Sequence, residues 1–285
     1  MSAAPEHAPP GGDEARAVPG GGTSSEVPAA GAVRLEVQGA VATVVFDRPQ
    51  ARNAMTWAMY EQLQAVGERL RADPAVRVAC FRGAGGQAFV AGTDIAQFQA
   101  FGGGEDGVAY ERRIDACIAL LASLPMPTVA VVQGWCVGGG LAIAAACDLR
   151  IATPDARFGV PIARTLGNCL SIANVARLVA VFGRPRVQRL LLLADLVGAD
   201  EALACGFVLE QVPADRLDAA ADRLCQRLAA LAPVTQRVSK ETLGRLLDLD
   251  LPPVEDLVRQ AYGSEDFREG VRAFVAGRPP AWQGR

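Results

Sequence analysis

The sequence predicts a mixed α/β core that is followed by a region of helices only. Short apolar segments rich in β-branched residues alternate with longer segments whose apolar residues recur at helical spacing. From about Pro213 onward only helical patterns remain, and the 285 residues suffice for one large domain or two. The alternation favours parallel pairing of the strands.

The first predicted strands and helix lie between residues 33 and 84. Residues 33–49 are typical of two strands around a Gly-Ala turn, because β-branched residues flank the turn on both sides. Asn53 then introduces a predicted helix over 54–73. Its apolar residues at helical spacing are Met55, Met59, Leu63, Val66 and Leu70. Residues 76–84 follow as a short buried strand that ends at glycine.

The next units continue the alternation. Residues 89–101 are predicted to be a loop that leads into a helix, with Asp94 placed to cap that helix. After a glycine-rich loop, residues 108–124 are predicted to be helical. Residues 128–134 and 148–153 are predicted strands.

Three consecutive glycines, 138–140, lie between the last two predicted strands. They lead into residues 141–146, which are mostly good helix formers. Backbone N–H groups at the start of a helix are unpaired and attract negative charge. The turn is therefore predicted to hold an anion, or a carbonyl that becomes one during a reaction. The alternative is a close helix–strand contact without a ligand.

Composition excludes several function classes. The net charge of −3 gives no reason to expect a nucleic-acid or membrane partner, and no apolar run is long enough to cross a bilayer. Residues 1–30 are rich in Pro, Gly, Ala and Ser and lack the apolar centre of a secretory signal. We expect them to form a disordered tail.

The histidine and cysteine content restricts the possible chemistry. The single histidine, His7, lies in the predicted tail, so a Ser-His-Asp triad, a Cys-His dyad and a histidine-ligated zinc are excluded. The seven cysteines are scattered without a CxxC pair, and we expect reduced core residues of a cytoplasmic protein. Carboxylates, hydroxyls, thiols, backbone amides or the substrate must supply the chemistry.

Five sequence motifs in order resemble the crotonase superfamily, the enoyl-CoA hydratase/isomerase family. They are VATVVFDRPQARNAM (41–55), FVAGTDI (89–95), GWCVGGGLAIAAACDLRIAT (134–153), EALACGFVLEQV (201–212) and SEDFREGVRAFVAGRPPAW (264–282). The resemblance implies a spiral of ββα repeats over 31–212 with a helical C-terminal region over 213–285. It also implies assembly as trimers or paired trimers. The expected partner is an acyl-CoA substrate, and no metal or redox cofactor is expected because CoA enters with the substrate.

The same resemblance implies roles for the two loops. The N–H groups of Thr93 and Gly139 would form an oxyanion hole for the thioester carbonyl. The carbonyl of Ala91 would meet the pantetheine arm, and Arg52 would meet a phosphate of CoA, unless it is only a solvated surface charge. The neighbouring residues Gly92, Asp94 and Gly138 are expected to contact the substrate as well. The alternative role of Asp94 is to cap the following helix without contacting the substrate.

The chain departs from the family at two positions. The resemblance places catalytic glutamates where this sequence has Ala142 and Ile162. Neither side chain can transfer a proton, so ordinary two-glutamate hydration is unsupported. The resemblance makes Asp115 the first candidate for a replacement acid or base, because it falls where the dehalogenase branch of the family has its active-site histidine. Glu111 is the second candidate, since it lies four residues away on the same helix face. The alternative is that both pair with Arg112, Arg113 or another exposed charge.

Three further residues near the motifs have polar or reactive groups. Asn168 is a candidate to orient a water or bind a polar acyl group, and its alternative is to cap the following helix. Cys169 and Cys136 are expected to be packing residues, because no histidine is present to activate a thiol.

The sequence leaves two functions open. The first is an acyl-CoA enzyme of the hydratase/isomerase type with a displaced acid. The second is a non-catalytic protein that binds acyl-CoA and has lost the acids. Within the first class, hydration, isomerisation, decarboxylation and thioester cleavage stay open.

Overall fold

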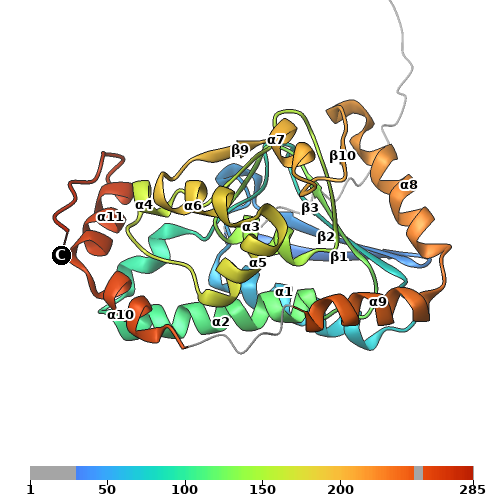
Figure 1. The fold of residues 1–285 in the computed structure, drawn as a ribbon, viewed down its shortest axis with the longest axis horizontal. Helices are drawn as coiled ribbons and strands as arrows, with labels where there is room; N and C mark the ends of the chain where they lie inside the picture. Colours follow the sequence, from blue (N-terminus) through green and yellow to red (C-terminus); the bar gives the residue numbers. More distant parts are fainter. Residues whose placement is uncertain (1–29, 247–252, 285) are drawn as a thin grey trace, which may run out of the picture.

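The computed structural model describes residues 30–246 and 253–284 (Figure 1). The tail predicted for residues 1–30 lies outside the described residues except for Ala30. Among the helices of the described ranges, none combines the length and the apolar character that a membrane span needs.

Two sheets form the centre of the molecule, with strand orders β1-β2-β3-β5-β7-β10 and β4-β6-β8-β9. The first contains β1 (Ala32–Gln38), β2 (Val41–Asp47), β3 (Val78–Gly83), β5 (Thr128–Val132), β7 (Leu149–Ala152) and β10 (Glu210–Gln211). The second contains β4 (Ala88–Ala91), β6 (Trp135–Val137), β8 (Arg157–Gly159) and β9 (Leu196–Gly198). The β1–β2 and β8–β9 pairs are antiparallel, and the other pairs described are parallel.

Strands and helices follow one another in a repeating order. The helices up to β10 are η1 (Pro49–Ala51), α1 (Trp57–Ala72), η2 (Ile95–Ala100), α2 (Gly104–Ala122), α3 (Gly139–Ala146), α4 (Ile162–Thr165), α5 (Ile172–Phe182), α6 (Arg184–Leu192) and α7 (Ala199–Ala204). One unit is β3, β4 and α2, the next is β5, β6 and α3, and a third is β7 and β8 followed by α4 to α6. Each unit gives one strand to each sheet, which makes the spiral of ββα repeats expected from the resemblance.

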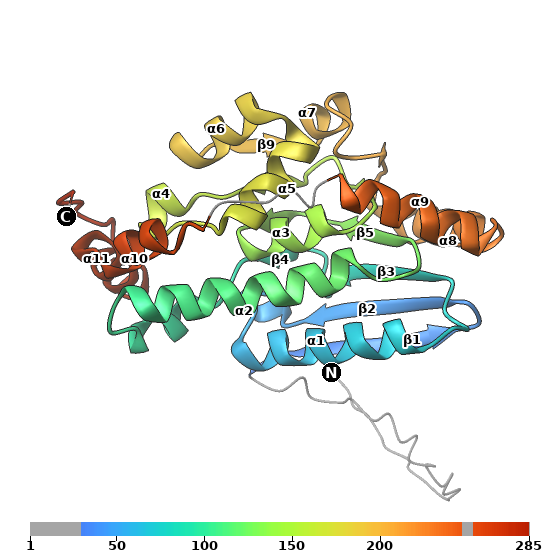
Figure 2. The same cartoon turned by 60° about the horizontal axis from the view of Figure 1, so that its bottom comes forward.

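From Ala214 on, the described residues form helices: η3 (Ala214–Arg216), α8 (Leu217–Ala229), α9 (Pro233–Arg245), α10 (Glu255–Gly263) and α11 (Glu265–Val275). Helix α8 packs on the six-stranded sheet, and α10 lies along α2 (Figure 2). Helix α11 packs against η2. Helices α8, α10 and α11 therefore pack against the sheet and the helices that precede them.

Strand β5 shows why the centre of the sheet is apolar throughout. All five of its residues are buried, because both faces of the strand are covered. Val129 and Val131 pack in the same cluster as the α8 residues, whereas Ala130 and Val132 belong to the central core. The alternation follows from side chains pointing to opposite faces of a strand.

Arg150 fixes the C-terminal end of α3. Its Nη1 donates to the carbonyls of Ala144 at 3.0 Å and Cys147 at 2.6 Å, and its Nε donates to the carbonyl of Phe207. The guanidinium also lies 4.6 Å from the Phe207 ring centroid. A cation at this end satisfies carbonyls that the helix leaves unpaired. Arg150 therefore holds the C-terminal end of α3 in place. The N-terminus of the helix, at Gly139, lies at its other end.

The structure differs from the local expectations in three places. Helix α2 begins at Gly104 instead of about residue 108, because the Asp106 side chain accepts from the N–H groups of Gly102 and Gly103. Asp94 caps the following helix as expected, but that helix is the 3-10 helix η2. The four-stranded sheet was not predicted, since its strands of three or four residues are too short for a periodic pattern.

Candidate active site

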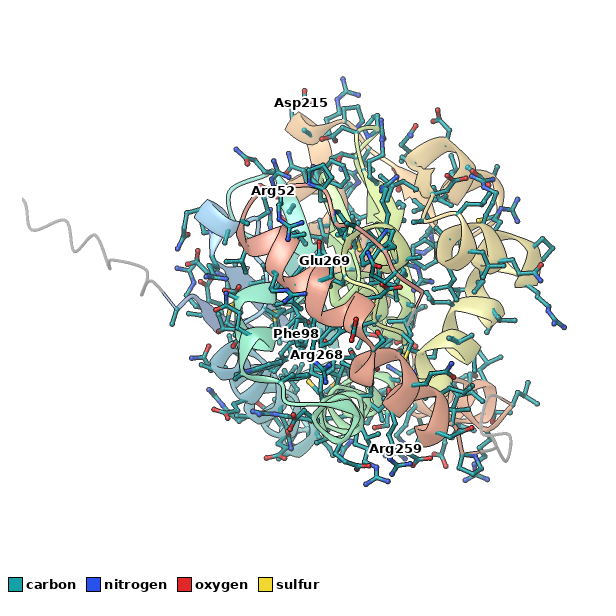
Figure 3. All side chains as sticks on the ribbon, turned by 90° about the vertical axis from the view of Figure 1, so that its left-hand side faces the viewer. Arg52, Phe98, Asp215, Arg259, Arg268 and Glu269 are labelled. Atoms are coloured by element: carbon teal, nitrogen blue, oxygen red, sulfur yellow. The ribbon has the colours of Figure 1, made fainter. Side chains whose placement is uncertain are left out.

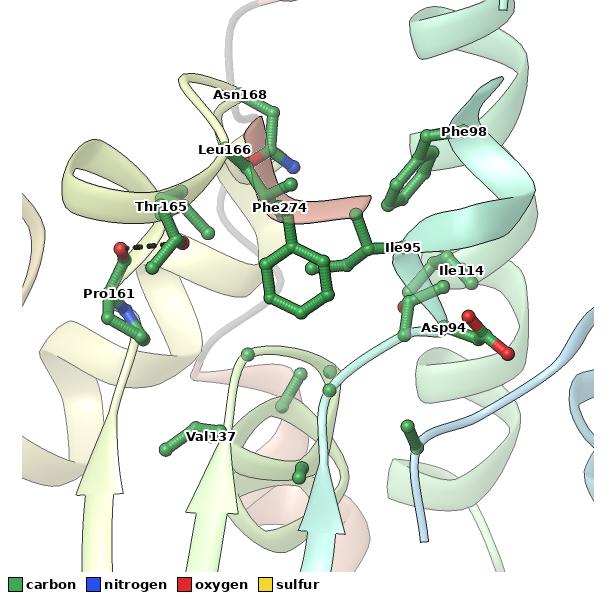
Figure 4. A pocket seen from close by; sticks show the side chains of 18 of the residues that line it. Asp94, Ile95, Phe98, Ile114, Val137, Pro161, Thr165, Leu166, Asn168 and Phe274 are labelled. Atoms are coloured by element: carbon green, nitrogen blue, oxygen red, sulfur yellow. Dashed lines mark hydrogen bonds between the residues drawn. The ribbon is translucent and has the colours of Figure 1, made fainter. Parts of the chain in front are cut away.

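A cavity of about 550 Å³ opens where α2, α3 and α11 meet the ends of β4 and β6. Its polar lining residues include Thr93, Tyr110, Glu111, Asn168 and Asn174. Most of the remaining wall is apolar, and the ring of Phe274 projects between Thr165 and Ile95 (Figure 4). A mainly apolar cavity with a few converging polar groups is typical of a small-molecule site.

The backbone N–H group of Thr93 points away from the neighbouring segment of the chain, which contains Met55. The Met55 N–H donates to the Gly92 carbonyl at 2.8 Å, and the Asp94 N–H donates to the Met55 carbonyl at 2.8 Å. Because successive N–H groups along an extended segment point to opposite sides, the N–H of Thr93 points away from Met55.

Gly139 lies beside Thr93 at the start of α3. Strands β4 and β6 pair Ala91 with Val137, which brings the residues that follow them together. A β-carbon placed on Gly139 would lie 3.6 Å from Thr93 Oγ1. The Ala142 N–H donates to the Gly138 carbonyl at 3.1 Å, so the N–H of Gly139 precedes the hydrogen bonds of the helix. Thr93 and Gly139, predicted from the sequence to act together, thus line one cavity.

Each of the three glycines is required for a different reason. Gly138 has φ of +55°, which a side chain would strain. A β-carbon on Gly140 would lie 2.0 Å from the carbonyl oxygen of Val90 in β4. A β-carbon on Gly139 would lie 2.5 Å from the hydroxyl oxygen of Tyr60. The turn therefore combines the close helix–strand contact and the free N–H group, which the sequence analysis had left as alternatives.

Glu111 is a buried carboxylate in the wall of the cavity. Its side chain is held by the Tyr262 hydroxyl, which donates to Oε1 at 2.6 Å, and by the Ser171 N–H, which donates to Oε2 at 3.0 Å. Burial raises the pKa of Glu111 to about 7, although both hydrogen bonds act in the opposite direction. The negative charge of Asp115 adds to the increase in this pKa.

Asp115 lies one turn further along α2 and is not among the residues that line the cavity. Its Oδ1 accepts from the Ser171 hydroxyl at 2.6 Å and from Asn174 Nδ2 at 3.1 Å. Burial raises its pKa as well. Of the two candidates, Glu111 is the one that lines the cavity. Its position there depends on contacts with α5 and α10 that helical spacing does not reveal.

The expected alternative pairings are also different in the structure. Arg112 pairs with Glu255, and Arg113 pairs with Glu61. The positive charge that acts on Asp115 is instead that of Arg177, which lowers the pKa of Asp115 against the effect of burial. Ser171 caps α5, which rules out that role for Asn168. Asn168 Nδ2 donates instead to the Tyr262 hydroxyl at 3.1 Å.

The remaining predicted residues are placed as follows. Ala142 and Ile162 line the cavity, as do Ala91, Gly92 and Gly138. Arg52 is exposed at the cavity, with its guanidinium carbon 6.0 Å from the Trp135 ring centroid. Asp94 caps η2 and pairs with Arg48 at 2.8 Å.

The two cysteines near the motifs are packing residues. Cys136 is fully buried, and burial raises the pKa of its thiol. Burial also raises the pKa of Cys169 to about 12, so neither thiol ionises readily.

The C-terminal helices supply site residues that the sequence analysis missed. Tyr262 of α10 holds Glu111, and Phe274 of α11 reaches the cavity. Figure 3 views the molecule from the end where α10 and α11 lie, with Phe98 beside them. The ending motif predicted these helices but gave no sign of which side chains reach the site.

The family profile described as enoyl-CoA hydratase/isomerase matches residues 36–285. The chain belongs to this family of enzymes. It is 31% identical over 250 residues to the short-chain-enoyl-CoA hydratase of Clostridium acetobutylicum, covering 86% of this chain and 95% of that protein. It is 32% identical over 264 residues to the (E)-benzylidenesuccinyl-CoA hydratase of Thauera aromatica, covering 88% and 99%.

Solved structures of family members share the fold. An enoyl-CoA hydratase/carnithine racemase from Magnetospirillum magneticum has a TM-score of 0.73 and 32% identity, covering 92% of this chain and 100% of that chain. A methylmalonyl-CoA decarboxylase in complex with 2-nitronate-propionyl-CoA has a TM-score of 0.81 and 25% identity, covering 89% and 98%. The fold class and family predicted from the sequence are confirmed.

The raised pKa of Glu111 makes a prediction for stability. The folded-state pKa of about 7 lies above the ordinary value of 4.5, so the folded protein binds this proton more tightly than the unfolded chain. The free energy of unfolding should therefore fall by about 3 kcal/mol between pH 4.5 and 7 on account of this group. Urea unfolding across this range should show a flatter pH dependence for Glu111→Gln. The exposed Glu61→Gln is the matched control, and an unchanged slope in Glu111→Gln would contradict the assignment.

The contact between Gly139 and Tyr60 predicts a rescue. Gly139→Ala should lower the free energy of unfolding by about 1–3 kcal/mol, because the new methyl group meets the Tyr60 hydroxyl. In a Tyr60→Phe background the same change should cost less than about 1 kcal/mol, as measured by a double-mutant cycle. Gly140→Ala serves as the control that Tyr60→Phe does not rescue, since its obstacle is the β4 backbone. Equal costs for Gly139→Ala in both backgrounds would refute the contact.

Proposed function

We propose that this family member is an acyl-CoA enzyme that forms a thioester enolate. The observation that carries the proposal is one shared cavity, lined by Thr93, Gly139 and Glu111. Removing an α-proton, adding water to a conjugated double bond and losing a carboxylate all place negative charge on the thioester oxygen. The enolate is therefore the species common to these reactions.

The N–H groups of Thr93 and Gly139 hold the thioester oxygen in this proposal. Each preorganised donor of this kind contributes about 3 kcal/mol to the stability of the anion. Helix α3 adds the positive end of its dipole at Gly139. The support for this role is that both residues line the cavity and that each N–H is directed away from its own secondary structure.

Glu111 transfers the proton. A carboxyl group with a pKa of about 7 is present in both protonation states at neutral pH, so it accepts a proton from the substrate and returns it later. Tyr262 and Ser171 fix its orientation. The carbonyl of Ala91 meets the pantetheine arm, and the exposed Arg52 meets a phosphate of CoA.

A non-catalytic protein that binds acyl-CoA is the second candidate function. Ala142 and Ile162, the two positions where the resemblance places catalytic glutamates, both line the cavity, and this favours the second function. The position of Glu111 in the same cavity favours the enzyme.

Assembly as a trimer or a pair of trimers remains part of the proposal. Helix α9 supports it, because several large apolar side chains of this helix are exposed in the single chain. They are Val234, Val238 and Leu243. Val234 and Val238 lie one turn apart on the same side of α9, and exposed apolar side chains of this kind suit a contact with another subunit.

Hydrogen–deuterium exchange at the α-carbon tests the proposal directly. A panel of small acyl-CoA thioesters is incubated with the protein in heavy water, and deuterium incorporation is followed by mass spectrometry. The wild type should incorporate deuterium, and Glu111→Gln should slow incorporation by about a hundredfold or more, because the proton acceptor is lost.

Asp115→Asn is the matched control, since its side chain does not line the cavity. It should retain most of the exchange. Loss of exchange in Asp115→Asn but not in Glu111→Gln would restore Asp115 as the acid or base. Tight binding of the thioesters without exchange in the wild type would support the non-catalytic function.

A further inference from the structure

Three hydroxyl groups form a closed hydroxyl ring at the Thr93–Gly139 turn. Thr93 Oγ1 lies 2.8 Å from the hydroxyl of Tyr60 in α1 and 2.8 Å from the hydroxyl of Tyr110 in α2. The Tyr60 and Tyr110 hydroxyls also form a hydrogen bond with each other. Because the three side chains come from three different segments, the hydroxyl ring joins α1, α2 and the segment after β4 at one point.

The hydroxyl ring uses all of its own hydrogens. Three hydroxyl groups carry three hydrogens, and the three contacts between them take up one hydrogen each. Burial raises the pKa of both tyrosines, so both hydroxyls keep their hydrogens at neutral pH. The hydroxyl ring therefore has neither a spare hydrogen for a ligand nor an ionised oxygen that acts as a base, and its role is one of position.

The Tyr60 hydroxyl lies between the two residues of the turn. On one side it is hydrogen-bonded to the side chain of Thr93. On the other side it faces Gly139, because a β-carbon placed there would lie 2.5 Å from the hydroxyl oxygen. The same β-carbon would lie 3.6 Å from Thr93 Oγ1. This hydroxyl therefore determines how closely Thr93 and Gly139 approach each other.

Neighbouring aromatic side chains hold both tyrosines in place. Tyr60 is only 2% exposed, and its ring centroid lies 6.4 Å from that of Trp57. The ring centroid of Tyr110 lies 5.5 Å from that of Trp57 and 5.0 Å from that of Phe98. Trp57 thus packs against both tyrosines. The two hydroxyl oxygens are therefore fixed points to which the segment at Thr93 is tied.

We propose that the hydroxyl ring fixes the spacing of the two N–H groups that bind the thioester oxygen, with Tyr60 and the side chain of Thr93 as the positioning groups. This inference rests on the proposed function, in which Thr93 and Gly139 supply those N–H groups. Donors that are already in place stabilise a developing charge better than donors that must first reorient. Any residue at position 93 would supply a backbone N–H, whereas only a side chain with a hydroxyl group closes the hydroxyl ring.

Thr93→Val tests the inference, because valine has the shape of threonine but lacks the hydroxyl group. The infrared carbonyl band of bound ¹³C-labelled butyryl-CoA reports how strongly the N–H groups polarise the thioester. In Thr93→Val we expect this band to broaden and to move toward its frequency in solution, and α-deuterium exchange to slow by at least about tenfold. Thr93→Ser restores a hydroxyl group and should recover most of both losses. S-butyl-CoA lacks the carbonyl oxygen, so its affinity should change much less than that of butyryl-CoA.

Tyr60→Phe and Tyr110→Phe are a matched pair, because each removes one hydroxyl group from the hydroxyl ring. Tyr60→Phe removes both the bond to Thr93 and the contact with Gly139, whereas Tyr110→Phe leaves both in place. The carbonyl band should therefore move further in Tyr60→Phe, although Tyr110 is the one of the two that lines the cavity. This pair also tests the inference if Thr93→Val does not fold.

Two kinds of failure are distinguishable. A wild-type carbonyl band in Thr93→Val or in Tyr60→Phe, or a larger effect of Tyr110→Phe than of Tyr60→Phe, would overturn the inference and leave the proposed function intact. A loss of thermal stability without any change in the band would overturn it as well, because the hydroxyl ring would then only stabilise the fold. A wild-type protein that binds butyryl-CoA with the carbonyl band at its solution frequency would instead refute the oxyanion hole and the proposed function with it.

Discussion

The close approach of α3 to β4 is the constraint on which the rest of the site depends. Gly140 packs against the carbonyl of Val90 at a distance that leaves no room for a β-carbon. This contact places the first N–H groups of α3 beside the extended segment at Thr93, which belongs to the loop after β4. Arg150 secures the other end of the helix through its carbonyls. The small apolar residues of α3 therefore allow the close packing that positions its N-terminus, and they also form part of the core.

The electrostatics of the cavity follow from the same packing. Glu111 and Asp115 both accept hydrogen bonds from Ser171 at the start of α5, where the helix dipole favours negative charge. Burial outweighs these contacts at Glu111 and leaves its pKa near neutrality. The cavity wall thus combines the turn at Thr93 and Gly139 with a carboxyl group whose pKa is about 7. Asp115 contributes by orienting Ser171 and by raising the pKa of Glu111.

Much of the fold could be predicted from the sequence, because its long periodic segments and its glycine-rich turn are local signals. The pairing of Thr93 with Gly139 followed from motif resemblance, and the structure places the two side by side. The four-stranded sheet could not be predicted, since its strands are too short to show a period. The position of Glu111 in the cavity wall depends on Tyr262, which is 151 residues away in the chain. Contacts over such separations have no local sequence pattern.

The central claim is that one oxygen atom of an acyl-CoA thioester binds to the turn formed by Thr93 and Gly139. The most direct test is a crystal structure of the protein with butyryl-CoA bound. The account predicts that the thioester oxygen lies about 2.7–3.1 Å from both backbone nitrogens. It also predicts that the α-carbon lies within reach of the Glu111 carboxylate. A thioester oxygen that contacts neither nitrogen, with the acyl group outside this cavity, would contradict the account.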